Sequence, residues 1–180
     1  MLKSKGFTLV ELIIVIVILA ILASVALPRL TNLQLDARIA KLNAARGSVA
    51  ATAAMVHATL FARNGRADVA PCPAGGGTAN NSSSGMGTLC SEAGIINLIN
   101  GYPAVTGIGV PGILTAAGLT TVFNPTQTEL QAEGYDYSVA GSTATFQVRG
   151  GSDPGNCSFS YTEPATNAAP IISIVTTTGC

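Results

Sequence analysis

The chain has 180 residues, of which 48% are hydrophobic and 10% are charged, and it contains no tryptophan. That length allows one modest folded domain and excludes a large multidomain enzyme. Nine basic and nine acidic residues give a formal net charge of zero, which gives no sign of a nucleic-acid-binding surface.

An apolar segment follows a short basic leader at the start of the chain. As an α-helix, the 21 residues from Phe7 to Leu27 extend about 30 Å, enough to cross the hydrocarbon core of a bilayer. Glu11 is the one charged residue in this segment. A carboxylate costs about 3 kcal/mol at the centre of a spanning helix and less near its end. Glu11 therefore either reaches the lipid headgroups or pairs with a cation.

The string Gly6-Phe7-Thr8-Leu9-Val10-Glu11-Leu12 lies between the basic leader and an apolar helix with Pro28 near its end. It resembles the type III signal of type IV pilins and the related secretion pseudopilins. In that family a prepilin peptidase in the membrane cuts after the glycine and N-methylates the new terminal residue. The resemblance implies a leader at 1–6, cleavage between Gly6 and Phe7, and methylation of Phe7. It also implies that Glu11 pairs with the N-terminal amine of a neighbouring subunit during filament assembly.

Two other interpretations of the N-terminus stay open. A cleavable secretory signal would use the small residues from Ser24 to Ala26 as its cleavage site, although Glu11 would interrupt its apolar region. A plain membrane anchor also fits, if residues 65–180 form an enzyme or a periplasmic binding protein. The flanking charges do not settle orientation, since four basic residues follow the helix and two precede it. A cytoplasmic N-terminus is therefore an implication of the resemblance.

The helix is expected to continue past Pro28 as an amphipathic one. Proline removes a backbone hydrogen bond, so Pro28 is either a hinge used on packing or a simple bend at the membrane surface. Beyond it, mostly apolar residues recur at alternating spacings of four and three. Segments 7–28 and 29–64 are thus predicted to be two halves of one helix that stops at Asn64-Gly65. The stripe comprises Leu35, Ile39, Leu42, Arg46, Val49, Ala53, Val56 and Leu60, with Arg46 as the charged exception.

The rest of the chain predicts an α+β, pilin-like fold. Glycine, serine and asparagine dominate much of region 65–134, which we expect to be loop with short helices at Ser91–Asn100 and Pro111–Ala117. Region 135–180 is expected to form an antiparallel sheet of about four strands, with one face against the amphipathic helix. The expected strands are Tyr135–Val139, Thr143–Val148, Cys157–Thr162 and Ile171–Thr177.

The four cysteines all lie in the half of the chain that would be exported. An even number in such a chain argues for disulfide bonds in an oxidising compartment. Of the three connectivities, nearest-neighbour pairing is favoured, which would join Cys72 to Cys90 and Cys157 to Cys180. Zinc binding is disfavoured, because there is no CxxC spacing and His57 is the only histidine.

The sequence offers little catalytic or cofactor chemistry, so we expect no catalytic residue, no cofactor and no metal. Segment Gly107–Gly112 formally fits GxGxxG, but it contains a proline and lacks a surrounding βαβ unit, which favours a plain loop. His57 falls beside the helical stripe and is expected to be a packed or exposed helix residue. Four carboxylates could in principle hold calcium but have no compact ligand pattern, and solvated turns are favoured. They are Glu129, Glu133, Asp136 and Asp153.

We therefore expect a non-enzymatic structural subunit whose main partner is itself, in a helical homopolymer. Two cysteine pairs and the terminal Cys180 favour a surface pilin over a type II secretion pseudopilin, which is the alternative. Segments Leu33–Arg38 and Asn100–Pro103 are most similar to pilins of the mannose-sensitive haemagglutinin type. The resemblance implies a precursor in the inner membrane with a periplasmic globular half, then an extracellular filament for adhesion, motility or DNA uptake. The other implied partners are prepilin peptidase and the pilus assembly machinery.

Overall fold

The computed structural model describes residues 7–180, apart from the side chains of 28–32. It divides into two compact units, one ending at Ala37 and one comprising Arg38–Cys180. Helix α1, Leu9–Arg63, contributes its first part to the first unit and the remainder to the second. The structure is thus a mixed α+β one that begins with a long, initially apolar helix, which confirms the predicted fold class.

The part of α1 in the second unit buries the predicted apolar stripe. Leu42, Val49 and Leu60 are at most 1% exposed, and Ala53 and Val56 are also buried. The charged exception, Arg46, is half-buried, and its Nε donates a hydrogen bond of 2.6 Å to the carbonyl oxygen of Ser173. The alternating spacing of four and three residues therefore marks the face of the helix that packs on its own domain.

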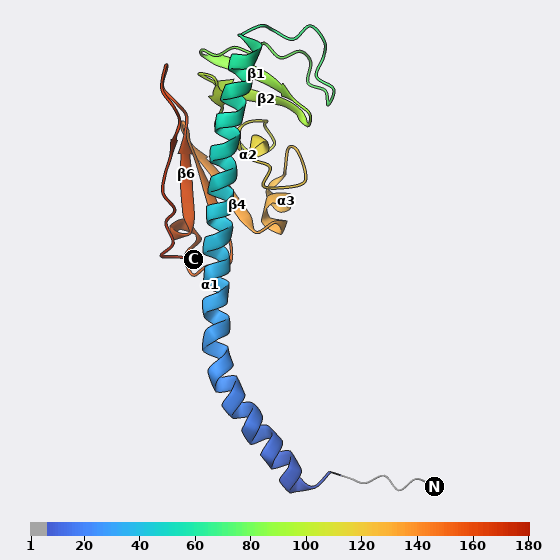
Figure 1. Cartoon of the computed structure of the whole chain (residues 1–180), viewed down its shortest axis with the longest axis vertical. Helices are drawn as coiled ribbons and strands as arrows, with labels where there is room; N and C mark the ends of the chain where they lie inside the picture. Colours follow the sequence, from blue (N-terminus) through green and yellow to red (C-terminus); the bar gives the residue numbers. More distant parts are fainter. Residues whose placement is uncertain (1–6) are drawn as a thin grey trace, which may run out of the picture. The chain divides into compact units, whose positions relative to one another are not determined.

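An antiparallel sheet of four strands packs against this helix face. Its order is β4-β5-β6-β7, and its strands lie alongside this part of α1 (Figure 1). A single cluster of buried side chains joins the sheet to the helix. In β5, buried and half-buried residues alternate along the strand, as expected where one face of a sheet is packed. Phe146 and Phe159 stack at 5.0 Å between ring centroids in the core. The strands are β4 Tyr135–Ala140, β5 Thr143–Val148, β6 Ser158–Thr162 and β7 Ile171–Ile172, with the 3-10 turn η1 Pro154–Asn156 before β6.

The expected helical turn at Ser91–Asn100 is wrong, because this stretch belongs to a second sheet. Strands β1 Met86–Ser91, β2 Gly94–Ile99 and β3 Tyr102–Pro103 form a three-stranded antiparallel sheet. Residues Gly94–Ile99 alternate strictly between buried and half-buried, a period of two. The Ser91 hydroxyl closes the hairpin by donating to the Gly94 carbonyl at 2.7 Å, in place of capping a helix.

Along the chain, two short helices lie between the strands of the first sheet and those of the second. Helix α2, Ile113–Ala116, confirms the helical turn predicted at Pro111–Ala117, and three of its residues are buried. Helix α3, Gln127–Ala132, was not predicted, and it places Leu130 in the core with no exposed surface. Region 65–134 thus contains a small sheet and two short helices as well as loops.

Candidate functional site

Glu11 belongs to a capping box at the start of α1. Both the backbone N–H and the hydroxyl of Thr8 donate to Oε2 of Glu11, at 2.9 and 2.8 Å. In return, the backbone N–H of Glu11 donates to the Thr8 hydroxyl oxygen at 3.3 Å. This reciprocal arrangement satisfies N–H groups that the first turn of a helix leaves free. The structure thus gives Glu11 a partner in its own chain, besides the headgroup and cation alternatives raised by the sequence.

The capping box leaves acceptor capacity on the Glu11 carboxylate. Its hydrogen bonds to other described residues all use Oε2, so Oε1 is available to a further donor. The carboxylate also lies in the first turn of α1, where the partial positive charge of the helix N-terminus favours an anion. This arrangement holds a carboxylate in a fixed position while keeping one of its oxygens free.

The helix that follows Glu11 is apolar on every side. Leu9–Leu27 has a mean hydropathy of 3.1 over its most apolar window, and none of it is buried. The hydroxyl of Ser24 donates to the carbonyl of Ile21 at 2.7 Å, so this polar group is satisfied within the helix. A helix that is apolar all round and long enough to span a bilayer fits a lipid environment or the interior of an assembly.

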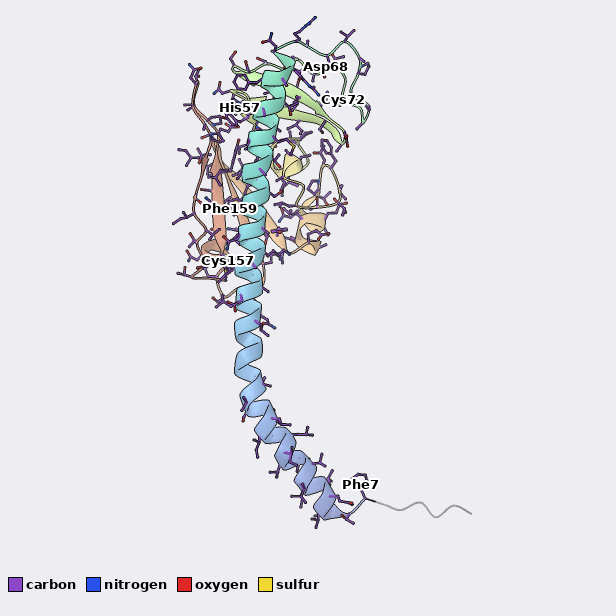
Figure 2. All side chains as sticks on the ribbon, in the orientation of Figure 1. Phe7, His57, Asp68, Cys72, Cys157 and Phe159 are labelled. Carbon is purple, nitrogen blue, oxygen red and sulfur yellow. A yellow bond between two sulfur atoms is a disulfide. The ribbon has the colours of Figure 1, made fainter. Side chains whose placement is uncertain are left out.

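Three predicted site residues flank or follow this segment. Phe7 lies just before the first turn of α1 (Figure 2), and its side chain is 83% exposed. Gly6, the predicted cleavage residue, lies outside the described residues. At Pro28, α1 continues as a helix in its backbone, while the side chain is outside the described set. The hinge at Pro28 and the cleavage at Gly6 therefore remain predictions.

The four cysteines form two disulfide bonds, each between nearest neighbours in sequence. Cys72 is joined to Cys90, which links the loop after α1 to strand β1. Cys157, which lies just before β6 and is labelled in Figure 2, is joined to Cys180. Cys157 and Cys180 are both buried, so this second bond is part of the main core.

His57 is packed among aromatic rings. Its Nδ1 donates to the carbonyl oxygen of Gly101 at 3.0 Å, which fixes the proton on that nitrogen when the ring is neutral. The ring stacks on Tyr102 at 4.0 Å between centroids and meets the edge of Phe61 at 4.6 Å. No carboxylate among the described residues hydrogen-bonds to it, so the arrangement is that of a packing residue and not of a general base.

The glycine-rich segment forms turns and bends. Segment Gly107–Gly112 lies before α2, where the Val110 N–H donates to the Gly107 carbonyl. A side chain at Gly112 would collide with the carbonyl of Ala104 and with Thr106, so the chain is too crowded there to cradle a phosphate.

Three of the four carboxylates considered for calcium have separate structural roles. Glu129 caps α3, and Asp136 accepts hydrogen bonds from Gln127, Gln131 and Arg149. Asp153 accepts from the Gly155 N–H and the Asn156 amide. In the part of the chain that the structure describes, no cluster of three or more histidine, cysteine or acidic side chains could hold a metal ion.

Thr8 is the site residue that the sequence analysis missed. The signal that could have found it is the pattern Thr-x-x-Glu ahead of an apolar run, which predicts a capping box. The same pattern occurs at Thr126 to Glu129, where the structure contains a second box and the unpredicted helix α3.

Comparison with protein families finds one match, to the prokaryotic N-terminal methylation motif, over residues 1–27. No curated protein and no solved structure matches the chain. The matched residues include Glu11, Thr8 and most of the apolar helix, which supports anchoring of a precursor in a membrane. The chain therefore carries the N-terminal methylation motif that is typical of type IV pilins and pseudopilins, in front of the α+β structure expected for that class.

Proposed function

We propose that this protein is a type IV pilin, the structural subunit of an extracellular filament. In this proposal 1–6 is a leader that prepilin peptidase removes between Gly6 and Phe7, and Phe7 is then N-methylated. Segment 7–28 holds the precursor in the inner membrane and later forms the filament core. Segment 29–64 joins it to the globular region, 65–180, which would lie in the periplasm before assembly and outside the cell afterwards.

The observation that carries the proposal is the Glu11 carboxylate at the head of a wholly exposed apolar helix. Cleavage after Gly6 would create an ammonium group on Phe7, four residues before Glu11. Two opposite charges about 4 Å apart attract by roughly 4 kcal/mol at an effective dielectric near 20. Each charge is costly alone in an apolar surrounding and tolerable in a pair. The free oxygen of Glu11 provides an acceptor for the Phe7 amine of a neighbouring copy.

The outer face of α1 in the second unit also supports self-assembly. From Gly47 to Ala62 its exposed positions carry no charge, and Met55 and Phe61 are 68% and 67% exposed. An exposed uncharged helix face is typical of an interaction surface. The proposed occupant is another copy of this chain, because polymerisation through α1 brings such helices together. The exposed residues are Gly47, Ala50, Ala51, Ala54, Met55, Ala58, Phe61 and Ala62.

The disulfide bonds favour a surface pilin over a secretion pseudopilin. A bond that closes a loop of about twenty residues stabilises a small domain by roughly 3 kcal/mol on the chain-entropy model. Two such bonds, one of them in the main core, suit a subunit that bears load and meets proteases outside the cell. A type II secretion pseudopilin remains the alternative, since the same N-terminal chemistry serves both.

The assembly step is tested by replacing Glu11 with alanine in the producing cell. We expect Glu11→Ala to leave cleavage and membrane insertion largely intact but to abolish filaments, because the Phe7 amine would lose its partner. Electron microscopy of sheared surface material measures filaments, and immunoblotting of membranes measures processed subunit. Glu129→Ala is the matched control, since Glu129 has the same capping contacts on α3. Normal filaments from Glu11→Ala would overturn the proposal.

The processing step is tested by mass spectrometry of the mature N-terminus. We expect a chain that begins at Phe7 and carries one methyl group on its amine. A start at Leu27 would instead indicate a secretory signal peptide, and a start at Met1 an unprocessed anchor. Filaments outside the cell would favour the pilin, whereas polymers confined to the periplasm would favour the pseudopilin.

A further inference from the structure

Two Asn-Gly dipeptides in this chain have similar, positive φ angles at both residues. They are Asn64-Gly65 and Asn100-Gly101. The φ angles of the two asparagines are 52° and 50°, and those of the two glycines are 66° and 83°. Because the dipeptides and their φ angles are matched, we expect a difference in chemical reactivity between them to come mainly from their surroundings.

Asn100 is held at both ends of its side-chain amide. It lies in the turn between β2 and β3, where Ile99 pairs with Tyr102. Its Oδ1 accepts from the Gly85 N–H at 3.0 Å, and its Nδ2 donates to the Pro164 carbonyl at 2.9 Å. The neighbouring glycine is also enclosed, since a Cβ on Gly101 would lie 3.2 Å from both His57 Nδ1 and the Ser83 carbonyl oxygen.

Asn64 has none of these restraints. It is exposed at the C-terminal end of α1, where its backbone N–H donates to the Phe61 carbonyl at 3.0 Å. Among the described residues nothing hydrogen-bonds to its side-chain amide, and a Cβ on Gly65 would meet nothing within 4 Å. The end of a helix opens more readily than a paired strand, so both the side chain and the next peptide can reorient.

We propose that Asn64 is a site of spontaneous deamidation and that Asn100 is protected from it. The backbone nitrogen of Gly65 attacks Cγ of Asn64, the Cγ–Nδ2 bond breaks, and ammonia leaves with the proton that the Gly65 nitrogen loses. The product is a five-membered succinimide. Water then opens either of its two carbonyls, which gives aspartate or isoaspartate at position 64. The net reaction consumes one water and releases one ammonia, with no change in oxidation state.

The modification would change the end of α1 in two ways. It adds a negative charge at a helix C-terminus, where anions are disfavoured, between Arg63 and Arg66. The isoaspartate product also lengthens the main chain by one methylene, directly before the loop that Asn81 holds by donating to the Arg66 carbonyl at 2.7 Å. These effects do not depend on polymerisation, so the inference stands apart from the proposed function.

The test is peptide mapping by mass spectrometry on the full chain in detergent, aged at mildly alkaline pH. We expect the peptide with Asn64 to gain the mass of an acid in place of an amide at least about tenfold faster than the peptide with Asn100. Isoaspartate at position 64 should appear beside aspartate. Equal rates at the two sites, or faster conversion of Asn100, would overturn the proposal.

Two controls separate the effect of the fold from that of the local sequence. In the reduced and denatured chain both Asn-Gly sites should convert at similar rates, because the hydrogen bonds that protect Asn100 are then absent. Asn64→Gln should remove the acidic species from the folded protein, since glutamine would have to form a six-membered ring. If the folded variant Asn64→Gln accumulates the acidic species as fast as the unaltered chain, the assignment to Asn64 is wrong.

Discussion

The same capping box occurs in two places in this molecule, at the start of α1 and at the start of α3. In both, a threonine donates twice to one glutamate oxygen, at 2.9 and 2.8 Å in α1 and at 2.8 and 2.9 Å in α3. The return bond from the glutamate N–H to the threonine hydroxyl is 3.3 Å in both. The same four-residue pattern, Thr-x-x-Glu, thus forms the same local structure at the start of both helices.

What differs is the helix that each box introduces. Helix α3 is six residues long, and it follows its cap with Leu130, which is wholly buried in the core. Helix α1 follows its cap with an apolar stretch that is entirely exposed. In α3 the carboxylate remains in water and only caps a helix. In α1 the same carboxylate heads a segment suited to lipid, so its charge has a cost that a second chain can relieve.

The largest predicted effect separates charge from capping. Glutamine also serves in a capping box, so Glu11→Gln keeps the hydrogen bonds to Thr8 and removes only the charge. Breaking a buried ion pair costs about 3–5 kcal/mol, which is roughly a hundredfold or more in each association constant. We therefore expect Glu11→Gln to abolish filaments, as measured by electron microscopy of sheared material, while Glu129→Gln assembles normally.

The opposite result from this pair of variants would also identify the role of Glu11. If Glu11→Gln forms filaments as well as Glu129→Gln does, Glu11 acts in assembly only as a helix cap. Both variants should give equal amounts of processed subunit in the membrane fraction, which checks that any loss of filaments is a loss of assembly.

Sequence periodicity predicted the elements whose residues repeat with a clear period. The bounds of β5 are the predicted ones, and the stripe on α1 is buried from Leu42 to Leu60 except at the half-buried Arg46. The hairpin β1–β2 was missed because Gly94–Ile99 has no charged or aromatic residue to mark its two faces. Its alternation becomes visible only when Ile96 and Leu98 pack against Val56 and Leu60 of α1, a tertiary contact.

The parts of the candidate site whose residues are close together in the sequence could be predicted. Glu11 stands out as the one charge in an apolar segment, and Thr8 follows from the capping pattern. The capping role of Glu129 follows from the same pattern. The hydrogen bonds of Asp136 with Gln127 and Arg149 could not be read from spacing, because the fold brings these residues together. The packing of His57 on Tyr102 joins residues far apart in the chain and likewise needs the fold.

A smaller effect should appear in the stability of the globular region. Replacing the N-cap threonine with valine removes the hydroxyl from the box, which costs about 1 kcal/mol where the helix is part of the folded core. We expect Thr126→Val to lower the free energy of unfolding by that amount, measured by thermal melting in detergent. Thr8→Val should leave the melting of the globular region unchanged, because Thr8 belongs to the unit that ends at Ala37, and the first buried core residue in the described part of the chain is Leu42. If Thr126→Val and Thr8→Val lowered the free energy of unfolding equally, the two capping boxes would not differ in their effect on the globular region.

The smallest predicted effect is the pH dependence of the box on α3. The Thr126 backbone N–H, and secondly its hydroxyl, donate to the ionised Glu129 carboxylate and hold the pKa of Glu129 below its ordinary value. A lowered pKa in the folded state means that this stabilisation is complete above the ordinary pKa and is lost as pH falls through the folded one. An NMR titration of the Glu129 carboxyl carbon measures it. Since the backbone bond is the larger cause, Thr126→Val should raise the pKa of Glu129 only part of the way back. A full return to the ordinary value would mean that the hydroxyl, and not the backbone N–H, holds the carboxylate.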